Sequence, residues 1–327
     1  MITESNGLVC LSHKKPLFRI DLKFTCIEGC AFEVIKGIPR FTNSQYAEAF
    51  GFQWNRFRKT QLDSFTGSAI TRNRLIEACG MEVWNFLGTA KVLEVGCGAG
   101  RFTEVLLDTG AIVNSVDLSL AVEANVQNFP VSNKHTVLQA DLARLPFNDR
   151  SFDVVFCLGV IQHTPNPEET ILHLSNQVKE GGWLVIDHYD KSISWYFRTA
   201  CLVRLVLKRL QPAVALSLIE GTYRITKPLF RISKNRIYRK VLNILIPVVY
   251  FENELPDLKA EMRDEWSILD TFDGLTDWHK HRRGPEQIMK TLLSAGLTNI
   301  VCFRGGNGIV ARGQKPVSSN PNSLVEL

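Results

Sequence analysis

The sequence lacks the features that would place it across a membrane or in an oxidising compartment. It contains no run of 18 uninterrupted apolar residues, so no membrane-spanning helix is expected. The N-terminus lacks the basic, then apolar, then small-residue order of a secretory signal. Internal repeats are absent, and the eight cysteines are scattered along the chain. We therefore expect reduced thiols, no disulfide framework and a cytoplasmic location.

Strong charge of either sign is also missing. The net charge is +5, with 22% charged and 45% hydrophobic residues, which is typical of a globular protein. A length of 327 residues allows one large domain with a sizeable core and one small domain. Composition alone therefore favours no particular class of partner.

What the sequence does contain is a glycine-rich turn between a strand and a helix. Lys91-Val-Leu-Glu-Val95 reads as a buried strand, and the helical spacing of apolar residues begins at Phe102. Between them, glycines alternate at Gly96, Gly98 and Gly100. Such a turn lets the backbone approach a ligand closely and directs helix N–H groups at it. The spacing is not that of the dinucleotide fingerprint, which argues against a nicotinamide cofactor.

The tight turn with an acid two residues upstream resembles motif I of the class I S-adenosylmethionine (SAM)-dependent methyltransferases, of the type 11 kind. Two further stretches resemble the same family, Ala111-Ile-Val-Asn-Ser-Val-Asp117 and Ala140-Asp-Leu-Ala-Arg-Leu-Pro-Phe147 followed by Ser151-Phe-Asp-Val-Val155. The resemblance covers residues 92–187. It implies an α/β fold: a Rossmann-like, seven-stranded, mostly parallel sheet with helices on both faces.

By this resemblance, one set of residues would bind SAM. Asp117, at the end of the second strand, would accept hydrogen bonds from the ribose hydroxyls. Asp141 would accept from the adenine amino group, and Leu142 would pack on the ring. The complete predicted set is Glu94, Gly96, Gly98, Gly100, Asp117, Leu118, Asp141, Leu142 and Leu158.

His163 follows the fourth strand, at the sheet edge where ligands bind in open α/β folds. It could take a proton from a substrate hydroxyl, because imidazole titrates near neutrality. The alternative is a histidine that only forms the wall of the SAM pocket, and the two interpretations stand equal.

Residues 1–45 contain two close pairs of metal-binding residue types, Cys10 with His13 and Cys26 with Cys30. Their spacing predicts a tetrahedral, structural zinc site. The segment resembles the zinc-ribbon modules that precede many bacterial methyltransferase domains, although those usually have cysteine where His13 stands. A small β module without metal is the alternative.

The segments on either side of this core are predicted to shape the pocket. Residues 46–90 form a helical entry segment, and in relatives a similar aromatic stretch lies over the SAM pocket, which makes Gln53 and Trp54 minor candidates for contact. The remaining boundaries place the SAM-binding half at 91–190, a helical cap at 191–260, the C-terminal part of the domain at 261–315 and a disordered tail at 316–327.

The cap differs in composition from the rest of the chain. Lys191 to Tyr250 holds twelve Lys or Arg and one acid, Glu220, interleaved with aliphatic residues. Basic amphipathic helices favour anionic membrane surfaces, and they also suit phosphate backbones. A helical lid with a solvated basic face is at least as good an explanation.

Residues 270–283 read as a polar, histidine-rich loop before a helix at Pro285 to Ala295, with a final antiparallel strand pair at Leu297 to Phe303 and Gly308 to Arg312. Candidate acceptor contacts are His188, Asp273, His279 and His281.

The function predicted from these features is methyl transfer from SAM to a small-molecule, glycan or lipid-linked acceptor, through a hydroxyl. Peripheral membrane contact through residues 191–250 is one prediction for the partner. An RNA methyltransferase and a non-catalytic SAM-fold binding protein are the alternatives. The sequence names neither the acceptor nor its reacting atom.

Overall fold

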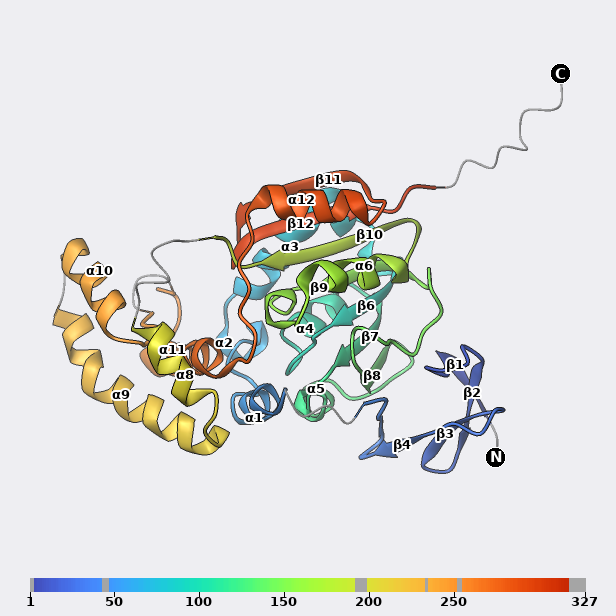
Figure 1. The fold of residues 1–327 in the computed structure, drawn as a ribbon, viewed down its shortest axis with the longest axis horizontal. Helices are drawn as coiled ribbons and strands as arrows, with labels where there is room; N and C mark the ends of the chain where they lie inside the picture. The colour runs from blue at the N-terminus through green and yellow to red at the C-terminus, as the bar shows by residue number, and fades with distance from the viewer. Residues whose placement is uncertain (1–2, 43–46, 192–198, 233–234, 252–254, 318–327) are drawn as a thin grey trace, which may run out of the picture.

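The computed structural model describes residues 3–42, 47–191, 199–232, 235–251 and 255–317. Its centre is a seven-stranded sheet with the order β11-β12-β10-β9-β6-β7-β8 (Figure 1). The strand β12 is antiparallel to both neighbours, and all other pairs are parallel. The strands are β6 (Lys91–Val95), β7 (Ile112–Asp117), β8 (His135–Gln139), β9 (Phe152–Cys157), β10 (Val178–His188), β11 (Thr298–Gly305) and β12 (Gly308–Gln314). The predicted α/β class and the antiparallel final pair are confirmed.

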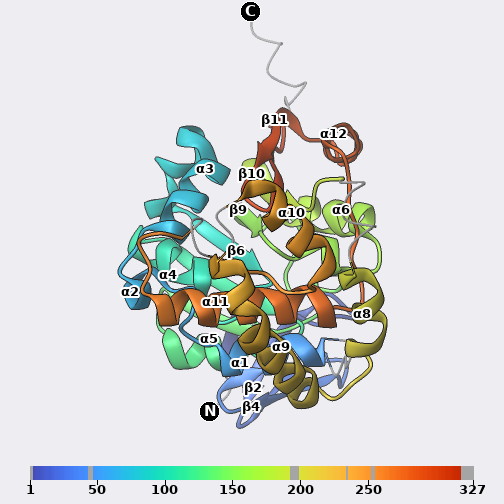
Figure 2. The ribbon, with the colours of Figure 1, turned by 90° about the vertical axis from the view of Figure 1, so that its left-hand side faces the viewer.

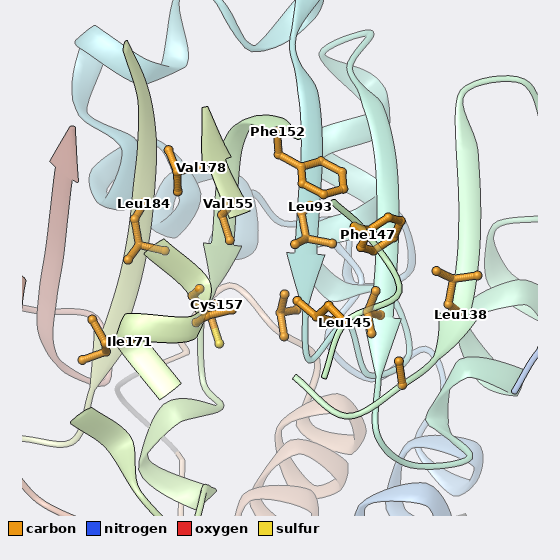
Figure 3. Packing of buried hydrophobic residues seen from close by; sticks show 14 of the residues in the cluster. Leu93, Leu138, Leu145, Phe147, Phe152, Val155, Cys157, Ile171, Val178 and Leu184 are labelled. Carbon is orange, nitrogen blue, oxygen red and sulfur yellow. The ribbon is translucent and has the colours of Figure 1, made fainter. Parts of the chain in front are cut away.

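Helices cover both faces of this sheet. Alternate residues of one strand enter different cores: Leu93 and Val155 pack with α6 and α12, whereas Val92 and Val154 pack with α3 and α4. This two-sided burial is why the central strands are apolar throughout. Figure 3 shows the first core, in which Phe152 lies between the sheet and Phe147. The covering helices are α3 (Ile70–Trp84), α4 (Arg101–Asp108), α5 (Ala121–Asn128), α6 (Pro167–Gln177) and α12 (Pro285–Ser294).

A small antiparallel sheet forms the N-terminal module, as expected. Its strands are β1 (Thr3–Val9), β2 (Pro16–Ile20), β3 (Lys23–Cys26), β4 (Ala31–Ile35) and β5 (Ile38–Pro39), in that order. The module docks at the β8 edge, where Phe41 N donates to Gln139 O at 2.7 Å and Arg40 forms an ion pair with Glu123. Its apolar residues join the first core of the large sheet. An edge strand that would otherwise be open is thereby covered.

The helical cap lies at the opposite end of the molecule from the N-terminal module (Figures 1 and 2). It has its own core, in which Leu216 and Ile219 of α9 meet Leu269 and Phe272 of α11 and Phe57, which follows α1. The helices concerned are α1 (Glu48–Arg56), α8 (Ala200–Leu207), α9 (Pro212–Ile232), α10 (Arg236–Leu245) and α11 (Ala260–Thr276). The entry helix α1 and the cap are therefore one packing unit.

Short elements complete the chain, namely α2 (Asp63–Thr66), η1 (Leu87–Thr89) and η2 (Ile161–His163). Two predictions need correction. Within the helical entry segment predicted at 46–90, the apolar spacing predicts a first core helix from Ile76 to Leu87, but α3 begins at Ile70 and is interrupted at Gly80, where φ is 61°. Residues 270–283 were expected to be a loop, but α11 continues to Thr276 because Leu269, Phe272 and Leu275 keep helical spacing on its buried face. Of the tail predicted at 316–327, residues 318–327 lie outside the described residues.

Candidate active site

A cavity of about 380 Å³ lies where β6, β7, β9 and β10 end, between the sheet and the cap. The carboxyl ends of parallel strands meet at this edge, which is where open α/β sheets bind ligands. Its walls come from the glycine turn, from the segments after β7 and β9, from α1 and α11, and from Asn243, residues 246–249, Lys280 and Arg282.

The glycine turn forms the floor of the cavity on one side. Gly98 has a φ of 51°, and a Cβ there would lie 3.1 Å from the Trp54 ring. A Cβ on Gly96 would lie 2.1 Å from a methyl carbon of Val160. Both positions therefore exclude larger residues, and the backbone itself is exposed to a ligand. The Trp54 ring of α1 therefore lies against this turn.

Asp117 ends β7 and lines the cavity. One carboxylate oxygen accepts a hydrogen bond from Gly98 N at 3.0 Å, and the other accepts from Ser119 N and Oγ at 2.8 and 2.7 Å. Burial raises the pKa of the carboxyl, while the hydrogen bonds from Ser119 and Gly98 act in the opposite direction. The carboxylate is thus held in place by the same turn that forms the floor. Leu118, Leu142 and Leu158 line the cavity too.

Three of the predicted cofactor residues are absent from the cavity lining. Glu94 is buried beneath the turn, where one oxygen accepts from Thr103 Oγ1 at 2.5 Å and Ser115 Oγ at 2.9 Å. Burial raises the pKa of this carboxyl to about 7. Gly100 is the N-cap residue of α4. Asp141 lies next to the lining residue Leu142 and accepts a hydrogen bond from Ala143 N at 2.9 Å.

His163 also lines the cavity, with the rings of Phe50 and Tyr189 each 5.4 Å away, edge-on. Its Nδ1 lies 2.9 Å from an Asp277 carboxylate oxygen and 3.2 Å from the carbonyl oxygen of His279. Both neighbours are acceptors, so Nδ1 carries the hydrogen in the neutral ring. The lone pair is then on Nε2, and the nearest carboxylate on that side is Asp273, at 3.9 Å.

Asp277 is buried and surrounded by cations. Its oxygens lie 2.6 Å from Arg204 Nε and 3.1 Å from Lys280 Nζ. Burial by itself would raise the pKa of this carboxyl, but Lys280, His163 and Arg204 outweigh it and the pKa is lowered. Asp277 therefore stays ionised and orients the imidazole. The sequence reasoning did not single it out, although Asp270, Asp273 and Asp277 stand at helical spacing on α11 and its C-cap.

Of the four predicted acceptor contacts, the structure brings Asp273 alone into the cavity lining. Gln53 Nε2 donates to it at 3.2 Å, so the minor candidate Gln53 lines the cavity as well. His188 is buried at the end of β10, and burial lowers its pKa to about 4.

His279 and His281 are also absent from the lining, with their rings 6.1 Å apart. The residues that alternate with them, Lys280 and Arg282, line the cavity instead and lie against the face of Tyr189. In an extended segment successive side chains point to opposite sides, which is why Lys280 and Arg282 line the cavity and His279 and His281 do not.

Two arginines near the glycine turn were also missed. Arg74 forms an ion pair with the buried Asp187, whose other oxygen accepts from Gly159 N at 2.5 Å. Arg101 donates to Gln61 Oε1 at 3.1 Å. Arg74 and Arg101 line the cavity, next to Asp270, whose pKa burial raises to about 7. The positive charge at this end comes from α3 and α4, which flank the turn in sequence.

The predicted metal ligands converge in the N-terminal module. His13 Nδ1 lies 3.6, 3.5 and 3.6 Å from the sulfur atoms of Cys10, Cys26 and Cys30, and the four ligand atoms all lie within 4.8 Å of one another. Tetrahedral zinc with ordinary bond lengths would separate nitrogen from sulfur by about 3.6 Å. The donor set and its geometry therefore fit zinc.

Comparison with known proteins agrees with this geometry. Residues 93–186 match the family described as "Methyltransferase domain". Two relatives bear the name ubiquinone biosynthesis O-methyltransferase. The one from Glaesserella parasuis is 29% identical over 133 residues, 38% of this chain and 56% of the relative. The one from Thiobacillus denitrificans is 30% identical over 129 residues, 38% and 55% of the two chains. The chain thus spans about half the length of the curated relatives it matches.

Among solved structures, a putative SAM-dependent methyltransferase from Methanococcus maripaludis is 12% identical to this chain. The match covers 84% of this chain and 96% of that one, with a TM-score of 0.45. The residues that match the family, 93–186, contain the glycine turn, Asp117 and His163. Residues 93–186 are therefore similar in sequence to a methyltransferase domain.

Proposed function

We propose that this chain transfers the methyl group of SAM to a hydroxyl of a small-molecule acceptor. The observation that carries the proposal is that Asp117 and His163 line one cavity and follow β7 and β9, the two strands that flank β6; the first is held by the glycine turn and the second by Asp277. The relatives' names add support, since O-methyltransferases act on oxygen.

The residues of the cavity fit SAM group by group. Asp117 offers a carboxylate for the ribose hydroxyls, and Leu118 and Leu142 offer apolar surface for the adenine ring. Arg74 and Arg101 offer positive charge for the carboxylate of the methionine part. The absence of a Cβ at Gly96 and Gly98 leaves room for the side chains of Val160 and Trp54, which line the cavity beside the turn. When bound, SAM supplies a methyl group on a positively charged sulfur, which leaves as a neutral thioether.

His163 then has the role of general base. Its Nε2 takes the proton of the acceptor hydroxyl as the oxygen bonds to the methyl carbon, and the resulting imidazolium is stabilised by Asp277 at 2.9 Å. Asp277 touches neither cofactor nor acceptor in this scheme, so it is a positioning residue. Phe50 and Tyr189, beside His163, offer aromatic walls for an apolar or ring-bearing acceptor.

The finer identity of the acceptor is part of the proposal. The cavity walls at Ile246, Pro247, Val248 and Val249 are apolar, which favours an acceptor with an apolar portion, such as a lipid-linked molecule, over a bare glycan. An RNA acceptor is less well matched, because exposed aromatic rings for base stacking are scarce among the described residues of the cap.

Calorimetric titration with SAM tests the cofactor site first. We expect the wild type to bind and Asp117→Ala to bind about 100-fold more weakly, because the ribose hydroxyls lose a charged acceptor and the turn loses its anchor. A matched control is Asp108→Ala, an exposed acid on α4 outside the cavity. A folded wild type without SAM affinity would contradict the function and favour a non-catalytic protein.

We also propose that Cys10, His13, Cys26 and Cys30 hold a structural zinc ion. Four protein ligands leave no open position for chemistry, so zinc would stabilise the module alone. Elemental analysis of purified protein should find about one zinc per chain. Cys26→Ser should lose it, and Cys302→Ser, which changes a cysteine outside the cluster, should retain it. Equal zinc content in the two variants would contradict the site.

A further inference from the structure

Exposed apolar side chains are more concentrated on the cap than on the rest of the described molecule. Among described residues, 27 large hydrophobic side chains are exposed, and thirteen of them lie between residues 199 and 250. They belong to α8, α9 and α10, which lie together at one end of the molecule (Figure 2). Such a concentration marks an interaction surface, whereas scattered exposed residues would not.

On α9 these residues form a stripe along the whole helix. Val214, Leu218, Ile225, Leu229 and Ile232 recur at helical spacing, and the exposed fraction reaches 77% at Ile225 and 80% at Ile232. The buried face of the same helix is separate, with Leu216, Ile219, Tyr223 and Phe230 packed inside. The exposed stripe therefore takes no part in the cap's own core, and its apolar side chains are placed to contact a binding partner.

The same pattern recurs on α10. Ile237, Tyr238, Val241, Ile244 and Leu245 are exposed on one face, while Leu242 is buried against α9. On α8, Leu202, Leu205 and Val206 are exposed and Leu207 is buried. Three neighbouring helices thus each bury one face and expose another apolar face.

Charge decides which partner fits this surface. Exposed basic residues flank the apolar stripes, among them Arg209, Arg224, Arg231 and Lys240. Over Lys191 to Tyr250 the sequence has twelve basic residues and one acid. Aliphatic stripes bordered by Lys and Arg are the chemistry that inserts at the headgroup boundary of an anionic bilayer. A nucleic acid would leave the aliphatic side chains uncovered, since Tyr238 is the one aromatic residue among the thirteen.

The cap also connects this surface to the cavity. Asn243 and Ile246 line the cavity, while the intervening Ile244 and Leu245 are exposed. The start of α8 is tied to the same point, because Thr199 N donates to Ile244 O at 3.0 Å. The end of α10 therefore has one side on the cavity and the other on the exposed apolar surface. Within the described residues no helix is long and apolar enough to cross a membrane.

We propose that the exposed faces of α8, α9 and α10 form a docking surface for an anionic lipid bilayer, and that docking brings the cavity to the bilayer so that the acceptor is taken from it. The docking surface is inferred from the exposed apolar side chains and the basic residues of these helices, independently of the proposed function. Its role in delivering the acceptor rests on the proposed function.

Flotation of the full chain with vesicles tests the surface. The wild type should float with phosphatidylcholine vesicles that contain phosphatidylglycerol, and float poorly with phosphatidylcholine alone or at high salt. Ile225→Ser with Ile232→Ser should weaken binding at least tenfold, about the loss expected for two buried aliphatic side chains. The matched control is Leu22→Ser with Ile27→Ser in the N-terminal module, where the exposed fractions are 67% and 69% and where binding should be unchanged.

A second pair of double variants separates the contribution of charge to vesicle binding from that of apolar contact. Arg224→Gln with Arg231→Gln should weaken binding to anionic vesicles and reduce its salt dependence. Lys23→Gln with Lys290→Gln, which removes two exposed charges outside the cap, should change neither.

Three results would overturn the inference: a folded wild type that stays unbound to anionic vesicles, equal losses in the cap and control variants, or a dimer that the cap variant converts to monomer, since a second copy would then cover the surface. RNA binding that competes with vesicles and survives Ile225→Ser with Ile232→Ser would also count against it. SAM titration on the same preparations keeps the two proposals apart: SAM binding without flotation rejects the docking surface alone, and flotation without SAM binding rejects the methyltransferase function alone.

Discussion

The two sides of the cavity are built in different ways. On the cofactor side, the glycine turn and Asp117 come from one continuous stretch and hold each other through the Gly98–Asp117 hydrogen bond. On the acceptor side, His163 is held by Asp277, which is anchored by Arg204 from the cap. Three distant segments must therefore meet before the base is oriented. A local motif suffices for the first side, whereas the second depends on tertiary packing.

The two sides also differ in how they treat a buried carboxylate. Beneath the cofactor side, Glu94 accepts from two hydroxyl groups, and burial raises its pKa to about 7. Beneath the acceptor side, Asp277 meets Lys280 and Arg204 and its pKa is lowered. Hydrogen bonds from hydroxyl groups hold a buried carboxyl in position but do not offset the rise in its pKa on burial. Neighbouring cations lower the pKa and keep the carboxyl ionised. A charged partner is needed on the acceptor side, because the proposed reaction forms an imidazolium at His163 and Asp277 stabilises it.

The largest expected effect is on the base itself. His163→Gln should lower kcat by about 10²–10⁴-fold while SAM affinity stays within a few-fold, because proton transfer is lost and the cofactor side is untouched. His281→Gln, a change in the neighbouring segment outside the cavity lining, should keep kcat within a few-fold. Single-turnover rates and SAM titration on both variants provide the measurement. Equal kcat for His163→Gln and wild type would show that His163 is only part of the wall.

The next effect is on stability. Asp277→Asn should lower the free energy of unfolding by about 3–5 kcal/mol, since it leaves two buried cations without their counter-charge. Asp108→Asn, which breaks an exposed pair with Arg72, should cost at most about 1 kcal/mol.

Urea unfolding measures both changes, and kcat at a temperature where both variants are folded tests positioning. An Asp277→Asn protein with the stability and kcat of the wild type would show that the acceptor side does not depend on the buried charge of Asp277.

A smaller effect separates the two carboxylates by pH. The folded-state pKa of Glu94 is raised from 4.5 to about 7, so its stabilising contribution is complete below pH 4.5 and is lost as pH rises through about 7. Glu94→Gln should therefore gain about 3 kcal/mol relative to wild type between about pH 4 and pH 9, at roughly 1.4 kcal/mol per pKa unit.

Asp277 has the opposite sign. Its lowered pKa gives a contribution that is present above the ordinary aspartate range and is lost as pH falls through the folded-state pKa. Urea unfolding of wild type and Glu94→Gln across this pH range measures the difference directly, because the groups common to both proteins cancel. A constant difference would mean that Glu94 titrates as it does in the unfolded chain.

The same contrast explains what could be predicted from sequence. The glycine turn and Asp117 follow from contiguous patterns whose partners lie within about 20 residues. Asp277 and Lys280 could not be found in this way, because their roles depend on α11 packing against the cap. The reading of residues 270–283 as a loop hid the helical spacing of Asp270, Asp273 and Asp277. It also left open which alternate positions of the following segment face the cavity.

The smallest expected effect tests how far the family resemblance can be carried residue by residue. Asp141 is predicted to accept from the adenine amino group, yet it lies outside the cavity lining and accepts from Ala143 N. If it does bind adenine, Asp141→Ala should weaken SAM binding about fivefold, the value of one net hydrogen bond, and should abolish discrimination against an inosine analogue that lacks the amino group. Calorimetry with both ligands measures the two effects. Retained discrimination in Asp141→Ala would show that Asp141 only stabilises its own turn and that Leu118 and Leu142 hold the adenine ring. Adenine recognition would then come from other parts of the fold, so the cofactor side too would depend on tertiary packing as well as on its sequence motif.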